Sequence, residues 1–473
     1  MKKKPVKKAA KKKTVKKKTT VMRSVNPCTE EVMNELPLMS RTEVSAIVAK
    51  ARHAFSHWRN VPALERAAYL KKLADVLRQE KKNYGTLITQ EMGKPIKDAM
   101  AEVEKCAWLA DYFCENGPRL MEHEIVPTEA KKSYIAFEPL GIVLAIEPWN
   151  FPFWQVFRVA VPALLAGNAV LLKHASNVPM TALAIEDSFR KAGFPENLLR
   201  TLLITSNDAM QLIDDDLVDA VSLTGSNRAG EEIGSRAGRK IKSLVLELGG
   251  SDPFIVLDDA DVVKAARTAV QARMVNAGQS CIAAKRFIVM EKVADEFTKH
   301  FIGRLKELKI GDPLDEMTDI GPLARKDILE GLKIQLRDAK TKGAKVIELT
   351  HDREKGFFLA PAIVLNPTAD MMVLAEEVFG PIAPVVVVKD EDEAVRVAND
   401  TEYGLGASIW SRDTDRAERL ARRIDAGCIA INDFVKSDPR LPFGGVKKSG
   451  VGRELSQYGL KELVNIKTIV VRE

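Results

Sequence analysis

Apolar residues recur along the chain at two spacings, which predict helices in its early part and buried strands after about residue 140. Residues 44–58 and 63–80 carry apolar side chains at helical spacing, so each range is expected to form an amphipathic helix. Later, short runs that are apolar on both faces alternate with helical stretches. Such runs are typical of parallel strands buried between layers of helices. The first runs are Ile142–Ile146, Ala169–Leu172, Leu199–Ile204, Val218–Leu223 and Leu244–Leu246.

A second alternating region extends from about residue 250 to 435, and two such regions favour an α/β fold with two α/β domains. Residues 131–137 alternate in polarity and are expected to form one arm of an exposed hairpin, while the last twenty residues include a β-branched strand. An exposed edge strand is often completed by another subunit, so a homo-oligomer is expected. The runs of the second region are Phe254–Leu257, Phe287–Met290, Val346–Leu349 and Pro384–Val388.

The bulk composition is typical of a soluble globular protein. The chain has 473 residues, 46% of them hydrophobic and 29% charged, which is enough for two or three domains with full cores. It lacks an apolar run of about 18 residues, so no membrane span is expected. Five cysteines without framework spacing indicate free thiols, a reducing compartment and thus a cytoplasmic protein. The histidines lack metal-ligand spacing and no CxxC pair occurs, so no metal is expected.

The positive net charge comes from residues 1–20. These residues hold eleven lysines and no acidic residue, and without them the net charge changes from +7 to −4. The segment is expected to be a disordered Lys-rich tail, because it repels itself strongly and has few large apolar residues. Two interpretations remain open: weak, salt-dependent contact with nucleic acid or another anionic surface, or a solvating extension without a partner.

Polar residues follow four of the predicted strands of the first region: Asn150, Lys173, Gly225-Ser226 and Glu247. In open parallel sheets ligands bind beyond the carboxyl ends of the strands, so these positions together predict a binding site. Taken singly, Asn150 could equally be a turn residue, Lys173 a solvated surface charge and Ser226 a helix cap. Glu247 is harder to explain in that way, because a buried carboxylate is costly without a task or a partner.

Residues 225–230 open a predicted helix with GSxxxG spacing. Amides at a helix N-terminus attract phosphate, and glycine lets the backbone approach it closely. The motif is weak alone, since no GxGxxG is present, but its place between Lys173 and Glu247 predicts a pyrophosphate site.

Cys281 ends the string Asn276-Ala277-Gly278-Gln279-Ser280-Cys281 and lies 34 residues after Glu247. A cysteine and a separate glutamate, each beside small residues, suit covalent catalysis followed by hydrolysis. The cysteine forms a thioester, and the glutamate activates the water that breaks it. The alternative is that Cys281 is a small buried hydrophobe, as free cysteines usually are.

From about residue 22 to its end, the chain resembles the NAD(P)-dependent aldehyde dehydrogenase superfamily. Within it, the similarity is closest to bacterial and archaeal-type succinate-semialdehyde dehydrogenases, through Lys173-His174-Ala175 and the stretch Ser437–Leu441 before Pro442-Phe443-Gly444-Gly445. The order and spacing of the shared motifs are specific. The other motifs are Pro148-Trp149-Asn150-Phe151-Pro152, Gly225-Ser226, Leu246-Glu247-Leu248-Gly249-Gly250, Gly278-Gln279-Ser280-Cys281 and Glu376-Glu377-Val378-Phe379-Gly380-Pro381.

The resemblance implies a domain division and a catalytic set. It implies that Cys281 attacks the aldehyde, that the Asn150 amide and the Cys281 N–H bind the oxyanion, and that Glu247 activates water. The presence of Glu247 favours hydrolysis to a free acid over transfer to coenzyme A. After the tail, the implied domains are a Rossmann-type cofactor-binding domain at 21–120 and 140–248, a catalytic α/β domain at 249–448, and a small β oligomerisation element at 121–139 and 449–473.

The resemblance also implies a nicotinamide cofactor. Many relatives that prefer NAD have a glutamate three residues after the cofactor lysine, where it repels a 2′-phosphate. Ser176 stands there in this chain, so NADP is expected to be preferred and NAD accepted. Lys173 and Glu377 are implied to hold the riboses. Ser226 is implied to bind the pyrophosphate. The full implied cofactor-binding set is Trp149, Lys173, Ser176, Gly225, Ser226, Gly249, Glu377 and Phe379.

Substrate choice is predicted from Arg158, eight residues after Asn150 on the helix that lines the family's substrate tunnel. A guanidinium there pairs with a distal carboxylate, as in succinate semialdehyde, unless it makes a structural ion pair instead. Some animal relatives have a second carboxylate-binding arginine six residues before the cysteine, where this chain has Val275. The pocket is expected to include Trp154, Ser280 and Ser437. Two alternatives stay open: a broad medium-chain aldehyde dehydrogenase, and a nucleic-acid-associated protein that acts through its lysine tail.

Overall fold

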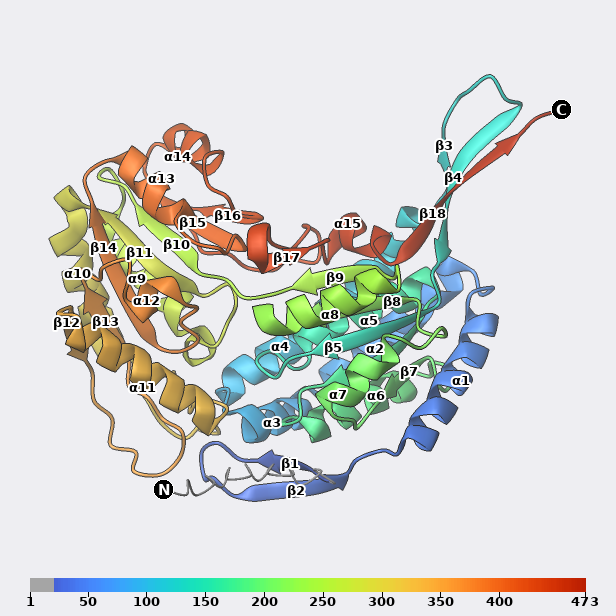
Figure 1. The fold of residues 1–473 in the computed structure, drawn as a ribbon, viewed down its shortest axis with the longest axis horizontal. Coiled ribbons are helices and arrows are strands. Elements are labelled where there is room, and N and C mark those ends of the chain that lie inside the picture. Colours follow the sequence, from blue (N-terminus) through green and yellow to red (C-terminus); the bar gives the residue numbers. More distant parts are fainter. Residues whose placement is uncertain (1–20) are drawn as a thin grey trace, which may run out of the picture.

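The computed structural model describes residues 21–473. Figure 1 shows two large sheets flanked by helices and a narrow arm that projects from one end of the molecule. The lysine tail, and with it the predictions of disorder and of nucleic-acid contact, lies outside the described residues. The expected α/β class, with sheets between helical layers, is confirmed.

The first sheet has six strands, in the order β17-β9-β8-β5-β6-β7. Strands β5 to β9 run parallel, and β17 pairs with β9 in the antiparallel sense through Gly450 and Glu247. The strands are β5 (Ile142–Glu147), β6 (Ala169–His174), β7 (Leu199–Thr201), β8 (Ala220–Thr224), β9 (Ser243–Glu247) and β17 (Gly450–Val451). The helices of this part are α1 (Arg41–Trp58), α2 (Ala63–Gln79), α3 (Lys81–Met92), α4 (Ile96–Leu120), α5 (Trp154–Ala166), α6 (Pro179–Lys191), α7 (Ser206–Leu212), α8 (Asn227–Arg239) and α15 (Ser456–Lys461).

Burial explains why these segments form strands and helices where the sequence predicted them. Every residue of β5, β6 and β8 is buried, as expected for central parallel strands covered on both faces. Helix α1 begins at a capping box formed by Ser40 and Glu43 and buries its apolar stripe. Helix α5 is buried along its whole length, between the sheet and α4.

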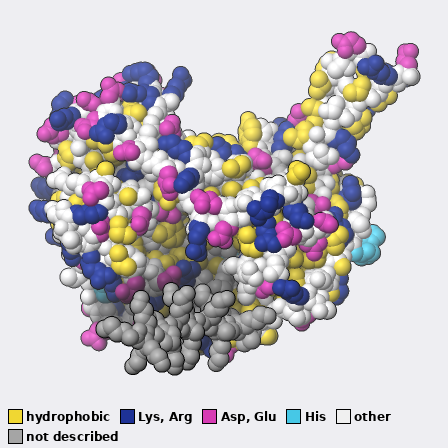
Figure 2. Space-filling model, in the orientation of Figure 1, with side chains coloured by type: hydrophobic (Ala, Val, Ile, Leu, Met, Phe, Trp, Pro, Cys, Tyr) yellow, Lys and Arg dark blue, Asp and Glu magenta, His cyan; other side chains and the backbone are white. Residues whose placement is uncertain are grey.

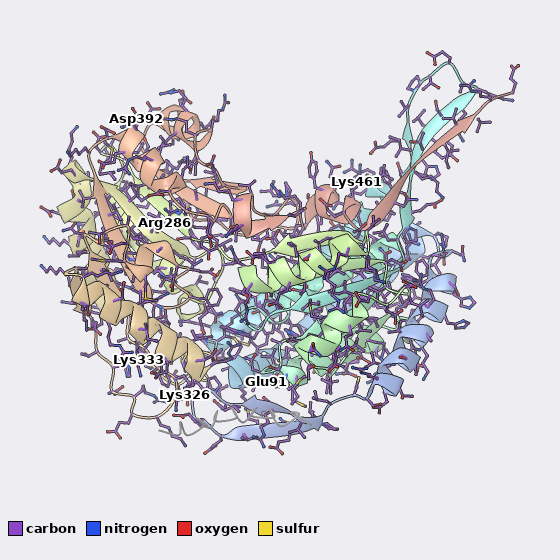
Figure 3. All side chains as sticks on the ribbon, in the orientation of Figure 1. Glu91, Arg286, Lys326, Lys333, Asp392 and Lys461 are labelled. Atoms are coloured by element: carbon purple, nitrogen blue, oxygen red, sulfur yellow. The ribbon has the colours of Figure 1, made fainter. Side chains whose placement is uncertain are left out.

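The second sheet has seven strands, in the order β12-β13-β14-β11-β10-β15-β16, and only β12 among them is antiparallel to its neighbour. Arg286 of β11 is buried within this part (Figure 3) and donates hydrogen bonds to three carbonyl oxygens, those of Ser251, Val397 and Ala398. The strands are β10 (Asp252–Val256), β11 (Ala284–Met290), β12 (Lys345–Glu348), β13 (Ala362–Leu365), β14 (Ile382–Val388), β15 (Gly406–Trp410) and β16 (Cys428–Ile431). The helices are α9 (Val262–Met274), α10 (Glu291–Lys306), α11 (Lys326–Thr341), α12 (Met372–Ala375), α13 (Glu391–Asn399) and α14 (Thr414–Ala421), with 3-10 turns η1 (Val275–Gly278) and η2 (Lys447–Ser449).

The projecting arm is a three-stranded antiparallel sheet of β18 (Val464–Val471), β4 (Lys132–Pro139) and β3 (Glu124–Ile125). The segment predicted as a hairpin arm thus pairs with the predicted C-terminal strand. Apolar side chains are exposed along it (Figure 2), among them Ile125, Ile466 and Val470. A separate two-stranded sheet joins β1 (Val21–Val25) and β2 (Val32–Pro37). The domain boundaries drawn from the resemblance remain a prediction.

Candidate active site

Four polar positions meet at the carboxyl edge of the six-stranded sheet. The register of the parallel strands places Lys173 opposite Ile146, and Glu247 opposite Thr224, so their ends lie at one level. Asn150 lies just beyond β5, and Gly225 just beyond β8, where its N–H donates to the Glu247 carbonyl at 2.9 Å. The structure therefore brings together the residues that the sequence placed after separate strands.

The loop that carries Cys281 has an unusual backbone. Asn276, Ala277 and Gly278 all have φ between 52° and 77°, in the left-handed region that disfavours residues with a Cβ. Arg273, fully buried at the end of α9, stabilises this loop by donating to the carbonyls of Gly278 at 2.8 Å and of Ala284 at 2.9 Å. Strained backbone of this kind persists only where its surroundings hold it, and it is common at active sites.

The Asn150 side chain is hydrogen-bonded to the same loop. Its Nδ2 donates to the Gln279 carbonyl at 3.1 Å, and Asn276 Nδ2 donates to the Asn150 carbonyl at 2.8 Å. One N–H of the Asn150 amide thus remains without a partner among residues 21–473. His174 fixes the other side of this segment, with its Nε2 2.9 Å from the Pro152 carbonyl, and burial lowers the pKa of His174 to about 4, so the ring is neutral.

A lysine and a glutamate tie the Cys281 loop to the turn after Glu247. Lys285 Nζ donates to the Cys281 carbonyl at 2.6 Å and lies 3.3 Å from Glu377 Oε1. The same Glu377 oxygen accepts the Gly250 N–H at 3.1 Å. A Cβ on Gly250 would lie 2.6 Å from the Cys281 carbonyl oxygen, so only glycine allows the two segments to pack this closely.

The surroundings of Cys281 disfavour its thiolate form. Burial raises the pKa of Cys281 to about 12, although the positive charges of Arg158 and Lys285 act in the opposite direction. The thiolate is the nucleophilic form of cysteine, so attack requires a base to remove the thiol proton.

Glu247 belongs to a buried group of three glutamates around one guanidinium. Burial is the largest cause that raises the pKa values of Glu147, Glu247 and Glu454, and the charge of Glu454 raises the first two further. Arg158 Nε lies 2.8 Å from Glu454 Oε2, so Glu454 is the carboxylate that the single positive charge stabilises directly. Glu247 consequently retains a proton to higher pH than a solvated glutamate, which makes its carboxylate a stronger base.

The residues just beyond β6 and β8 include polar groups that suit a nicotinamide dinucleotide. Lys173 Nζ has one hydrogen-bond partner among the described residues, Ser206 Oγ at 3.5 Å, and so retains donors for ribose or phosphate oxygens. Ser226 caps α8 and is exposed beside the helix amides, and Ser176 is exposed too. The rings of Trp149 and Phe379 meet edge to face at 5.8 Å.

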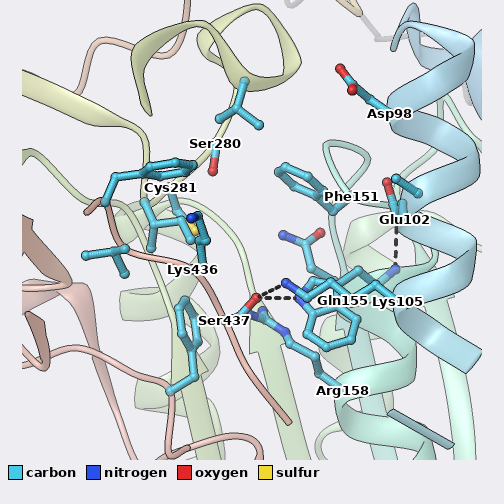
Figure 4. A pocket seen from close by; sticks show the side chains of 17 residues that line it. Asp98, Glu102, Lys105, Phe151, Gln155, Arg158, Ser280, Cys281, Lys436 and Ser437 are labelled. Atoms are coloured by element: carbon cyan, nitrogen blue, oxygen red, sulfur yellow. Dashed lines mark hydrogen bonds between the residues drawn. The ribbon is translucent and has the colours of Figure 1, made fainter. Parts of the chain in front are cut away.

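A cavity of about 250 Å³ opens beside Cys281 (Figure 4). Ser280 and Cys281 come from one wall, whereas α4 contributes Asp98, Glu102 and Lys105 to the opposite wall. The four residues predicted to bind substrate all line this cavity, and so does the apolar Val275. They are Trp154, Arg158, Ser280 and Ser437.

Sequence reasoning missed three charged residues of the site: Lys105, Glu454 and Arg273. Lys105 is half-buried, and the other two are buried. For Lys105 in α4 and Arg273 in α9, the local sequence pointed to the site only through a charged residue within or next to the apolar face of a helix. Glu454 lies in a loop before α15 and reaches the site only through the fold.

Two features of the described residues bear on other kinds of site. Among residues 21–473, no three or more histidine, cysteine, aspartate or glutamate side chains are grouped as metal ligands. Within the same range, every helix is too short or too polar to cross a membrane.

Residues 14–469 match the sequence model of the aldehyde dehydrogenase family. A protein of Synechocystis sp. named "Probable succinate-semialdehyde dehydrogenase (NADP(+))" is 46% identical over 94% of this chain and 98% of its own length. The Escherichia coli succinate semialdehyde dehydrogenase (NAD(P)+) is 43% identical over 94% of this chain and 97% of its own. The crystal structure of succinic semialdehyde dehydrogenase from Streptococcus pyogenes with NADP+ superposes with a TM-score of 0.93, at 36% identity over 96% of this chain and all of that one.

Proposed function

Because the chain belongs to the aldehyde dehydrogenase family, we propose that it oxidises succinate semialdehyde to succinate, with NADP as its preferred acceptor and NAD as an alternative. The observation that carries this proposal is the cavity in which Cys281 faces a wall with cationic side chains. Relatives named for this activity, which align with 94% of the chain, support it.

In the proposed mechanism the Cys281 sulfur attacks the aldehyde carbon and the carbonyl oxygen becomes an oxyanion. The thiol transfers its proton to water, because the charges of Arg158 and Lys285 favour the thiolate whereas those of Glu247 and Glu377 oppose it. The unpartnered N–H of Asn150 and the Cys281 backbone N–H stabilise the oxyanion. One such donor is worth about 3 to 4 kcal/mol in the transition state.

A bound nicotinamide cofactor would supply the acceptor for the hydride of the substrate carbon, and the thiohemiacetal on Cys281 would thereby become a thioester. Glu247 then takes a proton from water as the water oxygen attacks the thioester carbon. The carbon–sulfur bond breaks, and the acid and the free cysteine are released. The buried position of Glu247 and its raised pKa support this role.

Lys173, Glu377 and Ser226 are proposed to hold the cofactor, with Lys173 and Glu377 at its riboses and Ser226 at its pyrophosphate. Trp149, Phe379 and the backbone at Gly225 and Gly249 are proposed to complete the cofactor site. Ser176 carries no negative charge, so this position near Lys173 does not repel a 2′-phosphate, which supports binding of NADP. The remaining donors of Lys173 fit the same phosphate.

Arg158, Ser437, Trp154 and Ser280 are proposed to form the substrate pocket, because all four line the cavity beside Cys281. The positive charge of Arg158 favours an aldehyde that carries a carboxylate.

The arm of β3, β4 and β18 is proposed to join subunits into a dimer or tetramer, since it exposes apolar side chains on short edge strands. We also propose a cytoplasmic location, because all five cysteines are free.

A panel of aldehydes assayed with NADP and with NAD tests the proposed function. Succinate semialdehyde with NADP should give the highest kcat/KM. Equal activity on neutral medium-chain aldehydes would instead support a broad aldehyde dehydrogenase. Salt-dependent DNA binding of the full chain and of a chain without residues 1–20 tests the nucleic-acid alternative separately.

A further inference from the structure

We propose that Lys105, acting with Ser437, binds the carboxylate at the far end of the substrate. This inference rests on the proposed oxidation of a carboxylated aldehyde and adds a specificity-determining residue to it. Lys105 lies on α4, on the cavity wall opposite Cys281 (Figure 4).

Arg158, the cationic residue that the sequence pointed to, already has a partner. Its Nε lies 2.8 Å from Glu454 Oε2, and both side chains are almost completely buried. Its guanidinium also packs over the Phe443 ring, at 4.9 Å from the ring centre. A substrate carboxylate that bound Arg158 would share its charge with Glu454, so Arg158 alone is a weak anion site.

Lys105, in contrast, has no carboxylate within salt-bridge distance among residues 21–473. Glu102, the acidic residue of α4 that lines the cavity closest in sequence to Lys105, has both carboxylate oxygens bonded to other groups. Glu102 forms an ion pair with Lys94 and accepts the backbone N–H groups of Phe153 and Trp154 at 2.9 and 3.0 Å. The ammonium group of Lys105 is therefore a positive charge that still lacks an anion.

The hydroxyl of Ser437 makes this charge part of a carboxylate site. Its Oγ accepts from Lys105 Nζ at 2.8 Å and from Trp154 Nε1 at 3.0 Å. With both lone pairs used, the hydroxyl hydrogen can only be donated, and it has no acceptor among the described residues. Lys105 retains two further N–H donors. A carboxylate placed here would accept from the ammonium and from the hydroxyl.

The remaining lining of the cavity orients the substrate. Asp98 lies seven residues before Lys105 on α4, which is about 10 Å along the helix axis. The negative end of this wall therefore lies away from Lys105. Phe151, Val275 and Ile282 supply apolar surface for the carbon chain. The aldehyde can lie at Cys281 while the carboxylate lies at Lys105.

The protonation of Lys105 supports the same role. Burial is the largest cause that lowers the pKa of Lys105, to about 8, and the charge of Arg158 on α5 lowers it further. Glu102 and Cys106 on α4, and Asp438 in the loop that follows β16, act in the opposite direction. Lys105 is thus mostly charged at pH 7, and this charge is incompletely hydrated, which strengthens its hydrogen bonds to an anion.

The test compares Lys105→Met with the unmodified protein on two four-carbon aldehydes, succinate semialdehyde and butanal. We expect KM for succinate semialdehyde to rise about 10- to 100-fold with little change in kcat, because a charged hydrogen bond is lost. The kinetics with butanal should stay within about twofold, which also shows that the variant is folded. Lys97→Met, at an exposed ion pair on the same helix, is the matched control, and Lys105→Arg should restore most of the discrimination.

The pH dependence of KM provides a second test of the role of Lys105. In the unmodified protein, KM for succinate semialdehyde relative to butanal should rise above pH 8, as Lys105 loses its proton, and this rise should be absent in Lys105→Met. Equal loss of activity on both aldehydes in Lys105→Met, or no change on either, would overturn the role of Lys105. If the unmodified protein itself shows no preference for succinate semialdehyde, the proposed substrate is wrong, and this inference with it.

Discussion

Arg158 and Glu454 form an ion pair inside the protein, with 2.8 Å between Nε and Oε2 and with side-chain exposures of 3% and 4%. The pair joins α5 to the loop before α15, two segments far apart in the sequence. Two further buried glutamates, Glu147 and Glu247, lie in the field of the same guanidinium. Because only one positive charge is shared among three carboxyl groups, the pair determines which of them ionises first.

Glu454→Gln should destabilise the protein and also change its pH profile. Breaking a buried pair leaves an uncompensated charge, so the free energy of unfolding should fall by about 3 kcal/mol, measured from urea denaturation. The exposed pair of Arg304 and Glu307 offers the control, and Glu307→Gln should cost less than about 1 kcal/mol.

The same variant removes a charge that raises the pKa of Glu247, so the acid limb of kcat should move to lower pH. An unchanged urea midpoint in Glu454→Gln would show that the ion pair contributes nothing to stability.

Glu247→Gln should separate the two halves of the reaction. Loss of the general base prevents hydrolysis of the thioester, and a base of this kind contributes about 10²- to 10⁴-fold. Stopped-flow measurement should therefore show a burst of reduced cofactor, about one per active site, followed by very slow turnover. If the burst is lost as completely as the turnover, Glu247 acts before the thioester forms. Cys281→Ala is the matched control, and it should give neither burst nor turnover.

Ser176→Glu should shift the cofactor preference towards NAD. A carboxylate near Lys173 would repel the 2′-phosphate of NADP and accept hydrogen bonds from the ribose hydroxyls of NAD. We expect the ratio of kcat/KM for NADP to that for NAD to fall by about tenfold or more, which corresponds to about 1.4 kcal/mol. Ser176→Ala, which adds no charge, should leave the ratio nearly unchanged. A preference of the unmodified protein for NAD would contradict the premise.

The reactivity of Cys281 towards iodoacetamide should rise steeply with pH in the protein without ligands. Burial raises the pKa of Cys281 to about 12, so the thiolate fraction grows about tenfold per pH unit between pH 7 and 10. Mass spectrometry identifies the alkylated residue, and the other four cysteines provide internal references. A rate that is already constant near pH 7 would mean that the thiolate forms without help from a base.

Local patterns predicted the sheets well, because a strand that is buried on both faces consists of a short run of apolar residues. The runs at Ile142–Ile146 and Ala169–Leu172 became β5 and β6, each extended by one or two residues into polar positions. The run at Val218–Leu223 starts two residues before β8, because Val218 and Asp219 precede the strand. Where a strand ends depends on its neighbours in the sheet, and spacing alone does not contain that information.

The active site was predicted only as far as its residues follow strands or belong to motifs. The roles predicted for Cys281, Asn150 and Glu247 arose in this way, and the structure brings their segments together. Lys105 was not predicted, because a lysine on a helix is normally solvated, and only packing against Trp154 and Ser437 places it on the cavity wall. The ion pair of Arg158 likewise depends on a residue almost 300 positions away, which no local pattern reveals.

The pairing of β17 with β9 has a practical consequence for shortened chains. Gly450 completes the sheet edge at Glu247, and the chain continues from there through α15 into β18 of the arm. A truncation meant to remove the arm by deleting everything after residue 448 would therefore also remove the strand that pairs with Glu247, the proposed general base. Point substitutions at the tip of the arm are the cleaner way to test the proposed subunit contact while the chemistry can still be measured.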